Sequence, residues 1–476
     1  MKPLILFLGV VSSAGVAQTI DPAAVTEILE SSDRLEAPGC VAGAFRNGSP
    51  IFVRGAGVAD LQRKKPLNGD SVFPAASVSK QFTALAAAKL IEQGKLSLDD
   101  DAGKYLPELR TQDAPVTVGM LMHNTSGVKD WIALLLLSGG EVSAISRVEA
   151  LGLLLKQKTN FTPGTRWEYS NGGFLLLSEI VARASGMPFE AYATKVILKP
   201  LGMKKSMFMN GALPKTANLV SGHVPEVGGY APENDYARIS GAGGLMTTMN
   251  DLAKYERDVA IGGRVWTPAV RKIMLTPGKL TSGEAAVTNT GTGYGGGLYI
   301  GQRYGQEFVA HLGGNAGFAM AYLRMPERKL GVILNCNHVE ANVTQKGQKL
   351  IELIEGDILS SPGNSGQLKQ APAPASSTAQ APKAAAAAVK VPANVSGKYV
   401  SDELPASYEL SEKDGQLEVT ILSPFAPASG IKVRNFKALP NGSFQGGPLT
   451  IRFEPDGKGL TVSGGAAKDI RFYRAP

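Results

Sequence analysis

Ser77 and Lys80 are side chains whose types and spacing could perform nucleophilic catalysis. They lie three residues apart in Ser77-Val78-Ser79-Lys80, so on a helix the hydroxyl and the amine share one face. A serine hydroxyl is a poor nucleophile at neutral pH and needs a base to accept its proton, which a lysine provides when burial lowers its pKa. Because Ser-x-x-Lys arises by chance about twice in a chain of this length, the alternative is a surface lysine near a capping serine.

Two later patterns favour the catalytic interpretation. Tyr169-Ser170-Asn171 offers a phenol that could relay a proton and an amide that could orient a lysine or a substrate carbonyl. His311-Leu312-Gly313-Gly314 ends in two glycines, Gly313 and Gly314, which let a substrate backbone approach closely. The alternatives are a packing role for Tyr169 and a hydrogen-bonded strand histidine at His311.

The elements that must position these residues follow from hydrophobic periodicity. Phe73 to Ala76 reads as an extended approach to a helix that begins at Ser77 and ends near Gln93. Further predicted helices and strands lie on both sides: helices at 21–34, 118–123, 250–259 and 343–358, a mostly helical stretch at 141–201, and strands at 40–45, 50–53, 297–300, 308–311, 318–324 and 330–336. Strands at both ends with helices between them predict an α+β fold with one antiparallel sheet.

Composition divides the chain into four parts. Residues 1–17 have the pattern of a secretory signal peptide, and residues 18–359 form the predicted catalytic domain. Residues 360–394 are rich in Pro, Ala, Ser and Gln and predict a solvated linker. Residues 395–476 carry short strands separated by turns, which predicts a small C-terminal β-barrel.

Length and charge limit the classes of function. The 476 residues are 43% hydrophobic and 19% charged, which is typical of a globular protein. The net charge of +8 is scattered along the chain, so nucleic-acid binding is not expected. After the signal peptide no stretch reaches about 18 apolar residues, so no transmembrane segment is expected. We therefore predict a periplasmic or secreted protein.

Cysteine and histidine give no sign of a metal site. Cys40 and Cys336 are the only cysteines, each in a predicted strand. Two buried thiols are the favoured interpretation, and a disulfide in an oxidising compartment remains open. His123, His223 and His338 lack ligand spacing, so neither a metal nor another cofactor is expected.

Taken in order, the three motifs resemble those of the serine β-lactamase and penicillin-binding-protein superfamily. The branch with Tyr-x-Asn includes class C β-lactamases, DD-carboxypeptidases, D-aminopeptidases and related esterases. Shorter matches agree: Tyr105-Leu106-Pro107, Leu121-Met122-His123-Asn124-Thr125-Ser126-Gly127, Pro200-Leu201-Gly202-Met203 and Gly243-Gly244-Leu245-Met246-Thr247-Thr248. The likeness covers about residues 22–360, and the C-terminal segment looks like the small barrel often appended to this family.

The resemblance implies a role for each motif residue. Ser77 would be the acylated nucleophile, Lys80 its base or charge partner, and Tyr169 the proton relay. Asn171 would orient the substrate or the lysine, and the N–H groups of Ser77 and Gly314 would form the oxyanion hole. Whether Lys80 or Tyr169 is the acylation base stays open.

One departure from class C β-lactamases concerns the third motif. Those enzymes carry Lys-Thr-Gly where this chain has His311-Leu312-Gly313, a pattern that resembles the carboxypeptidase and D-aminopeptidase relatives. A neutral imidazole binds a carboxylate less strongly than a permanent cation does. The difference favours peptides or esters over β-lactams.

The leading hypothesis is serine hydrolysis through an acyl-enzyme on an amide or ester, with a D-amino-acid peptide as substrate. The alternatives are a β-lactamase or carboxylesterase, and a non-catalytic protein that binds or senses penicillins or peptidoglycan fragments. A third places the main task in the C-terminal barrel, through contact with the cell wall or another partner. Substrate and oligomeric state are not indicated by the sequence.

Overall fold

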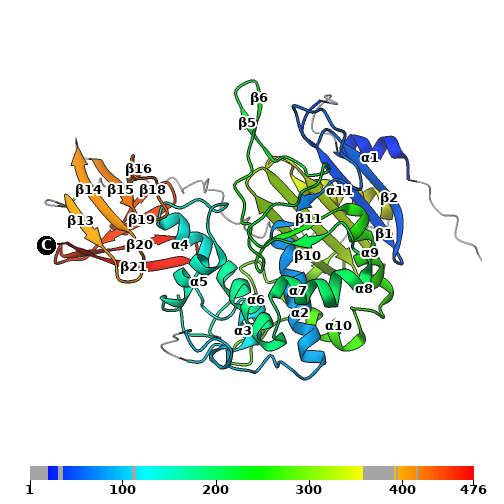
Figure 1. The fold of residues 1–476 in the computed structure, drawn as a ribbon, viewed down its shortest axis with the longest axis horizontal. Coiled ribbons are helices and arrows are strands. Elements are labelled where there is room, and N and C mark those ends of the chain that lie inside the picture. The colour runs from blue at the N-terminus through cyan, green and yellow to red at the C-terminus, as the bar shows by residue number, and fades with distance from the viewer. Residues whose placement is uncertain are drawn as a thin grey trace, which may run out of the picture.

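The computed structural model describes residues 20–29, 36–109, 114–356, 391–392, 395–413 and 416–475. It has an α+β domain and, beside it, a smaller domain made of strands (Figure 1). The α+β class predicted from the sequence is confirmed. The proposed signal peptide lies outside the described residues, as does almost all of the proposed linker, so these domain boundaries stay predictions.

A seven-stranded antiparallel sheet forms the frame of the first domain in the described part of the chain. Its strands, in spatial order, are β2 (Ser49–Ala56), β1 (Cys40–Arg46), β12 (Leu330–Cys336), β11 (Phe318–Met325), β10 (Gln306–Asn315), β9 (Tyr299–Arg303) and β8 (Gly293–Tyr294). The N-terminal β1 pairs with β12, almost 300 residues later in the chain, with Cys40 opposite Cys336. The predicted sheet assembled from distant segments is therefore confirmed.

Alternation along β1 explains how both faces of the sheet are covered. Ala42 and Ala44 belong to the apolar cluster that includes α1 and α11, whereas Val41 and Phe45 belong to the cluster with α9 and the helical region. Successive strand residues point to opposite faces, so a continuously buried strand must be apolar on both. The hairpin turn between β1 and β2 has positive φ at Asn47 (51°) and Gly48 (75°), which suits the predicted Asn-Gly turn.

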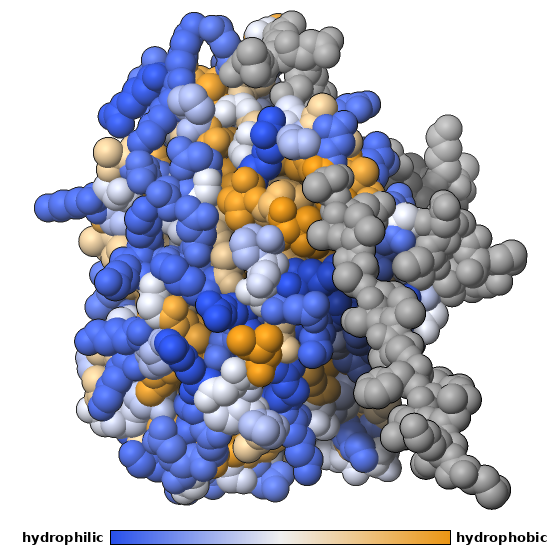
Figure 2. All heavy atoms as spheres, turned by 90° about the vertical axis from the view of Figure 1, so that its right-hand side faces the viewer, coloured by the Kyte–Doolittle hydropathy of each residue, from blue (hydrophilic) through white to orange (hydrophobic). Residues whose placement is uncertain are grey.

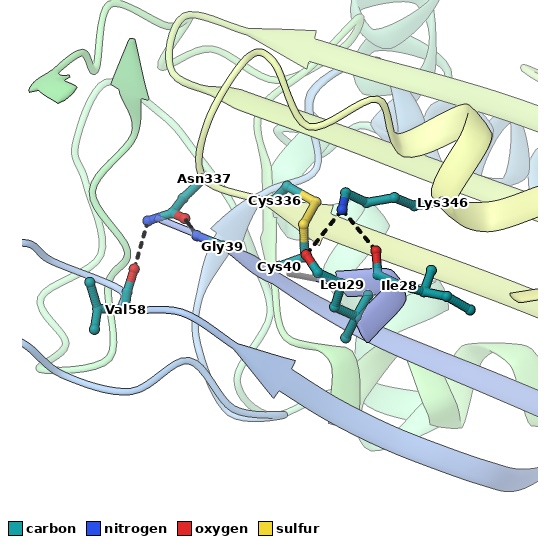
Figure 3. Close-up of a disulfide and its surroundings, with 8 residues drawn as sticks. All are labelled: Ile28, Leu29, Gly39, Cys40, Val58, Cys336, Asn337 and Lys346. Atoms are coloured by element: carbon teal, nitrogen blue, oxygen red, sulfur yellow. Dashed lines mark hydrogen bonds between the residues drawn. A yellow bond between two sulfur atoms is a disulfide. The ribbon is translucent and has the colours of Figure 1, made fainter. Parts of the chain in front are cut away.

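A disulfide joins Cys40 of β1 to Cys336 of β12 (Figure 3). Both residues are fully buried. The favoured sequence interpretation, two free thiols, is therefore wrong, because pairing of the two strands in this register places the cysteines directly opposite one another. Next to the bridge, Asn337 accepts a hydrogen bond from the Gly39 N–H at 2.8 Å and donates one to the Val58 carbonyl at 3.0 Å.

Helices pack on the sheet and also form a helical region beside it (Figure 1). Most of them lie, along the chain, between the second strand and the later strands of the sheet. They are α1 (Pro22–Leu29), α2 (Ser79–Glu92), α3 (Val118–Met122), α4 (Trp131–Leu137), α5 (Arg147–Leu155), α6 (Asn171–Ser185), α7 (Phe189–Ala193), α8 (Lys199–Leu201), α9 (Met249–Ile261), α10 (Pro268–Leu275) and α11 (Val343–Glu355), with a 3₁₀ turn at Ala76–Val78, another at Ala102–Lys104 and a π turn at Thr194–Leu198. The helix expected to begin at Ser77 is preceded by the 3₁₀ turn, so α2 itself begins at Ser79. All but three residues of α2 are buried, and it packs against α6 and α10.

Short strands complete the first domain. The three-stranded sheet contains β3 (Phe73–Pro74), β7 (Leu245–Thr247) and β4 (Met207–Phe208), and a two-stranded hairpin contains β5 (His223–Glu226) and β6 (Gly229–Pro232). The pairing of β3 with β7 brings the segment before Ser77 next to the glycine-rich stretch that ends at Leu245. Hydrophilic side chains cover most of the face seen in Figure 2, with apolar side chains in separate groups. None of the described helices combines the length and the apolar character needed to span a membrane.

The C-terminal domain is a curled half-barrel whose described strands form one nine-stranded antiparallel sheet. Its strands are β13 (Gly397–Val400), β14 (Ser407–Lys413), β15 (Gln416–Leu422), β16 (Ile431–Val433), β17 (Lys437–Ala438), β18 (Phe444–Gly446), β19 (Leu449–Phe453), β20 (Gly459–Gly464) and β21 (Ala467–Arg474). The end strands β16 and β17 lie at opposite edges. The domain rests on α4, where the buried Tyr408 hydroxyl donates to the Leu137 carbonyl at 2.6 Å.

Candidate active site

Ser77 lies in the 3₁₀ turn between β3 and α2, and only 8% of its surface is exposed. Ala76, immediately before it, has φ of 46°, a left-handed conformation that strains a residue with a Cβ. A strained turn of this kind points the backbone N–H groups and the serine hydroxyl in directions that a regular helix would not allow. The strain is held in place by burial on all sides, because Ala75, Ala76 and Val78 are buried.

Lys80 is completely buried one turn after Ser77. Its Nζ donates to three acceptors: Ser77 Oγ at 3.1 Å, Asn171 Oδ1 at 2.7 Å and the Ala242 carbonyl at 2.9 Å. Burial lowers the pKa of Lys80 to about 7, and the negative charge of Asp130 acts in the opposite direction. Lys80 can therefore exist as a neutral amine near physiological pH while its nitrogen contacts the serine hydroxyl.

Tyr169 brings its phenol to the same serine. Ser77 lies close enough to affect the pKa of the phenol, and the Lys80 Nζ lies 4.8 Å from the centre of the Tyr169 ring. Burial, first, and then the neighbouring Tyr299 raise the pKa of Tyr169 well above 10, with the charge of Asp130 acting in the same direction. The phenol therefore keeps its proton at neutral pH.

Asn171 is the first residue of α6, after the N-cap Ser170. Its Oδ1 accepts from Lys80, and its Nδ2 donates to Asp130 Oδ2 at 2.7 Å. Asn171 is 93% buried, so both ends of the amide are committed to neighbouring side chains. This arrangement places Asn171 against the lysine, one of the two positions that the sequence left open.

His311, on β10, is buried beside this group with both ring nitrogens occupied. Nδ1 lies 2.6 Å from the Leu312 carbonyl, so it carries the proton, and Nε2 accepts from the Tyr294 hydroxyl at 3.0 Å. Burial, followed by the charge of Lys80, lowers the pKa of His311 to about 3. The imidazole is therefore neutral and has no free nitrogen to offer a substrate carboxylate.

Gly313 and Gly314 lie on the segment of β10 that passes the turn before Ser77. A Cβ on Gly313 would come within 2.8 Å of the Ala75 carbonyl oxygen and 3.1 Å of the Ala76 Cβ, so only glycine fits there. Gly314 follows it and pairs with Ala319 of β11. The glycines thus allow β10 to run directly beside the serine turn.

All three sequence motifs meet at this place, and the structure adds groups that sequence reasoning missed. Asp130 holds Asn171, the Ala242 carbonyl accepts from Lys80, and the Tyr294 hydroxyl holds His311. Asp130 could have been noticed as an N-cap before the apolar run of α4. A backbone carbonyl such as that of Ala242 has no sequence signal. Within the described residues, no group of three or more His, Cys, Asp and Glu side chains is arranged to hold a metal ion.

Comparison with known proteins identifies the family. The family model described as Beta-lactamase matches residues 25–356, which is more than half of the chain. A D-aminopeptidase of Cereibacter sphaeroides is 28% identical over 324 residues, which are 67% of this chain and 61% of that protein. Esterase EstB of Burkholderia gladioli is 32% identical over 186 residues, 36% of this chain and 47% of the esterase. The chain thus spans less than two thirds of the length of these relatives.

A solved structure matches both domains. The octameric penicillin-binding protein homologue from Pyrococcus abyssi has a TM-score of 0.61 and 22% identity, covering 95% of this chain and 98% of its own. The predicted β-lactamase-like α+β domain with a small C-terminal β domain is thereby confirmed, and the predicted β-barrel is a curled half-barrel with β16 and β17 at its two edges.

Proposed function

This chain belongs to the beta-lactamase family, and we propose that it is a serine hydrolase that cleaves amides or esters of D-amino acids through an acyl-enzyme. The observation that carries the proposal is the contact of a fully buried lysine, with a pKa of about 7, with Ser77 Oγ at 3.1 Å. Burying the Lys80 amine costs hydration free energy, and perturbed pKa values of this kind cluster at functional sites.

Lys80 is the acylation base in this proposal. A neutral amine has two N–H donors and one lone pair. Asn171 Oδ1 and the Ala242 carbonyl, which can only accept, take the two donors, so the lone pair is left facing the Ser77 hydroxyl. Ser77 Oγ then forms its bond to the substrate carbonyl carbon while its proton moves to Lys80, and the N–H groups of Ser77 and Gly314 stabilise the oxyanion.

Tyr169 is the proton donor to the leaving group. Its pKa, raised well above 10, makes the phenol a weak acid that can pass a proton on only if it regains one from a neighbour. The Lys80 ammonium formed in the first half of the step is that neighbour. In deacylation the direction reverses: water loses a proton to this pair, and Ser77 Oγ regains one as the ester bond breaks.

The proposed preference for D-amino-acid peptides is supported by the D-aminopeptidase relative and by His311. The neutral His311, with both nitrogens occupied, offers no fixed cation for the carboxylate of a β-lactam or of a peptide C-terminus. Within the proposed class, an aminopeptidase or esterase substrate therefore fits this site better than a carboxypeptidase substrate or a β-lactam. Residues 1–17 further support export to the periplasm or out of the cell.

The test uses protein comprising residues 18–476 and its Ser77→Ala variant. The substrates are D-alanine p-nitroanilide with its L-enantiomer as control, an N-acyl-D-alanyl-D-alanine peptide, p-nitrophenyl butyrate and nitrocefin. We expect turnover of the D-anilide above the L-anilide, and its loss in Ser77→Ala. Turnover of the butyrate alone would identify an esterase, which the similarity to esterase EstB supports. Stoichiometric acylation without turnover would favour a penicillin or wall-fragment sensor, and full activity of Ser77→Ala would refute the mechanism.

A further inference from the structure

Asp130 is a 94% buried carboxylate next to Lys80, at the start of α4. Oδ1 accepts from the backbone N–H groups of Ile132 and Ala133 at 2.8 and 3.2 Å. Oδ2 accepts from the backbone N–H of Asn171 at 2.8 Å and from its side-chain Nδ2 at 2.7 Å. Four donors converge on the two oxygens, so this side chain acts only as an acceptor.

The acceptor character of Asp130 decides which way the Asn171 amide points. An amide has a donor end and an acceptor end, and the two are interchangeable in shape. Because Asp130 can only accept, the Nδ2 of Asn171 must face it, and Oδ1 must therefore face Lys80. A flipped amide would place its NH₂ group against the Lys80 ammonium and its oxygen against the Asp130 carboxylate, with both contacts repulsive.

The second domain holds the backbone of Asp130. The N–H of Asp130 donates to the Ala466 carbonyl, in the turn between β20 and β21, at 3.0 Å. The same carbonyl accepts from Asn160 Nδ2 at 2.9 Å. Asp130 is therefore fixed by α4, by α6 and by the half-barrel together.

We propose that Asp130 is a positioning residue: through the Asn171 amide it fixes the orientation of the Lys80 amine toward the Ser77 hydroxyl. This inference rests on the proposed function. The order of contacts is Asp130 to Asn171, Asn171 to Lys80, and Lys80 to Ser77, each joined by a hydrogen bond of 3.1 Å or less. With Oδ1 of Asn171 in place, one N–H of the neutral lysine is consumed and its lone pair is directed to the serine.

The negative charge of Asp130 gives this role a signature in pH. The titratable groups that face Lys80 are Ser77, Tyr169 and His311, which are neutral, and Asp130, whose charge raises the lysine pKa. Loss of that charge leaves burial unopposed, so the pKa of Lys80 falls further. The shift in the pKa of Lys80 therefore reports the loss of the charge, and dependence of the rate on the Asn171 amide reports the positioning.

Two variants separate positioning from folding. Asp130→Asn keeps the shape but replaces one acceptor with a donor. Asp130→Ser keeps an N-cap for α4, because serine caps helices about as well as aspartate, but cannot reach Asn171 and carries no charge. The matched control is Asp258→Asn: Asp258 is equally buried and accepts three backbone N–H groups, from Arg264, Val265 and Trp266, in a loop after α9.

The measurement is the second-order rate at which a fluorophosphonate labels Ser77 between about pH 5 and 9, a reaction in which Oγ bonds to phosphorus, fluoride leaves and the proton passes to the base. We expect both Asp130 variants to react about 100-fold more slowly, as for a misplaced catalytic group, and the acid limb of their pH–rate profiles to lie at lower pH. Asp258→Asn should lower the melting temperature and leave the labelling rate unchanged. In an Asn171→Ala background, Asp130→Ser should reduce the labelling rate little further, since Asp130 acts through that amide.

Labelling of Asp130→Ser at the parent rate would overturn the inference. Slower labelling would also overturn it if the acid limb did not move and the effects of Asp130→Ser and Asn171→Ala on the rate were fully additive. Those results would leave the proposed function intact. Absence of labelling at Ser77 in the parent protein would instead refute the proposed function. The two failures are therefore distinguishable in one set of reactions.

Discussion

In the proposed mechanism, the pH dependence of the reaction follows from the lysine that contacts Ser77. Lys80 must be neutral to accept the serine proton, and burial lowers its pKa to about 7. His311, with a pKa lowered to about 3, is neutral throughout the physiological range. Tyr169 keeps its proton because its pKa is raised well above 10. One ionisation therefore controls kcat/KM between about pH 5 and 9.

The magnitude follows from the fraction of neutral amine. With a pKa of about 7, half of Lys80 is neutral at pH 7, about a tenth at pH 6 and about a hundredth at pH 5. We expect kcat/KM to fall about tenfold per pH unit below pH 7 and to reach a plateau above pH 8. Lys80→Arg should remove the dependence along with about 10²- to 10⁴-fold of the rate, because a guanidinium keeps its proton.

The assay is hydrolysis of p-nitrophenyl butyrate, read at the wavelength where the phenol and phenolate absorb equally, so that product ionisation does not imitate the profile. Tyr169→Phe serves as the comparison, since it removes the proposed proton relay and leaves the lysine. We expect its rate to be lower and its acid limb to be within about one pH unit of that of the parent. A profile that is flat from pH 5 to 8, or that declines between pH 7 and 9, would refute Lys80 as the base.

Three further variants test how the site is supported. The melting temperature of the parent, measured by calorimetry, should rise between pH 7 and 10, because unfolded Lys80, with its pKa near 10.5, binds more protons there than the folded lysine does. In Lys80→Met the contribution of this lysine to the rise should be absent. Glu256→Leu leaves the buried Arg324 without its carboxylate and should cost about 3–5 kcal/mol in urea unfolding; a loss below about 1 kcal/mol would contradict a buried pair. Tyr408→Phe leaves the Leu137 carbonyl without its phenol donor and should cost about 1 kcal/mol, with labelling of Ser77 as the readout for any effect across the domain interface.

Local pattern was sufficient where a single element carries the information. Ser77 and Lys80 meet because three residues make about one helical turn, and this contact was predictable from their spacing together with the two later motifs. The hairpin between β1 and β2 was predictable from Asn47 and Gly48, because positive φ favours these residue types. The strands of the sheet were predictable from their apolar runs.

Contacts set by the tertiary fold were not accessible to the same reasoning. The partner of His311 is a hydroxyl on β8, and it is the pairing of β8 with β9 and β9 with β10 that brings Tyr294 to the imidazole. The positive φ of Ala76 had no signal, because alanine does not favour that conformation and only surrounding burial maintains it. The disulfide depended on the register of β1 against β12, which the sequence does not state.

The half-barrel contacts two segments that carry residues of the candidate site. Lys468 forms an ion pair with Glu168, the residue before Tyr169, and Ala466 accepts from Asp130. Deletion of residues 395–476 would break these contacts and expose the apolar side of α4, so we expect slower labelling of Ser77 as well as a lower melting temperature. If the half-barrel served only to bind the cell wall or another partner, a truncated protein that remains folded would label at the parent rate. That result would separate the second domain from catalysis, and a slower rate would make it part of the support for Asp130.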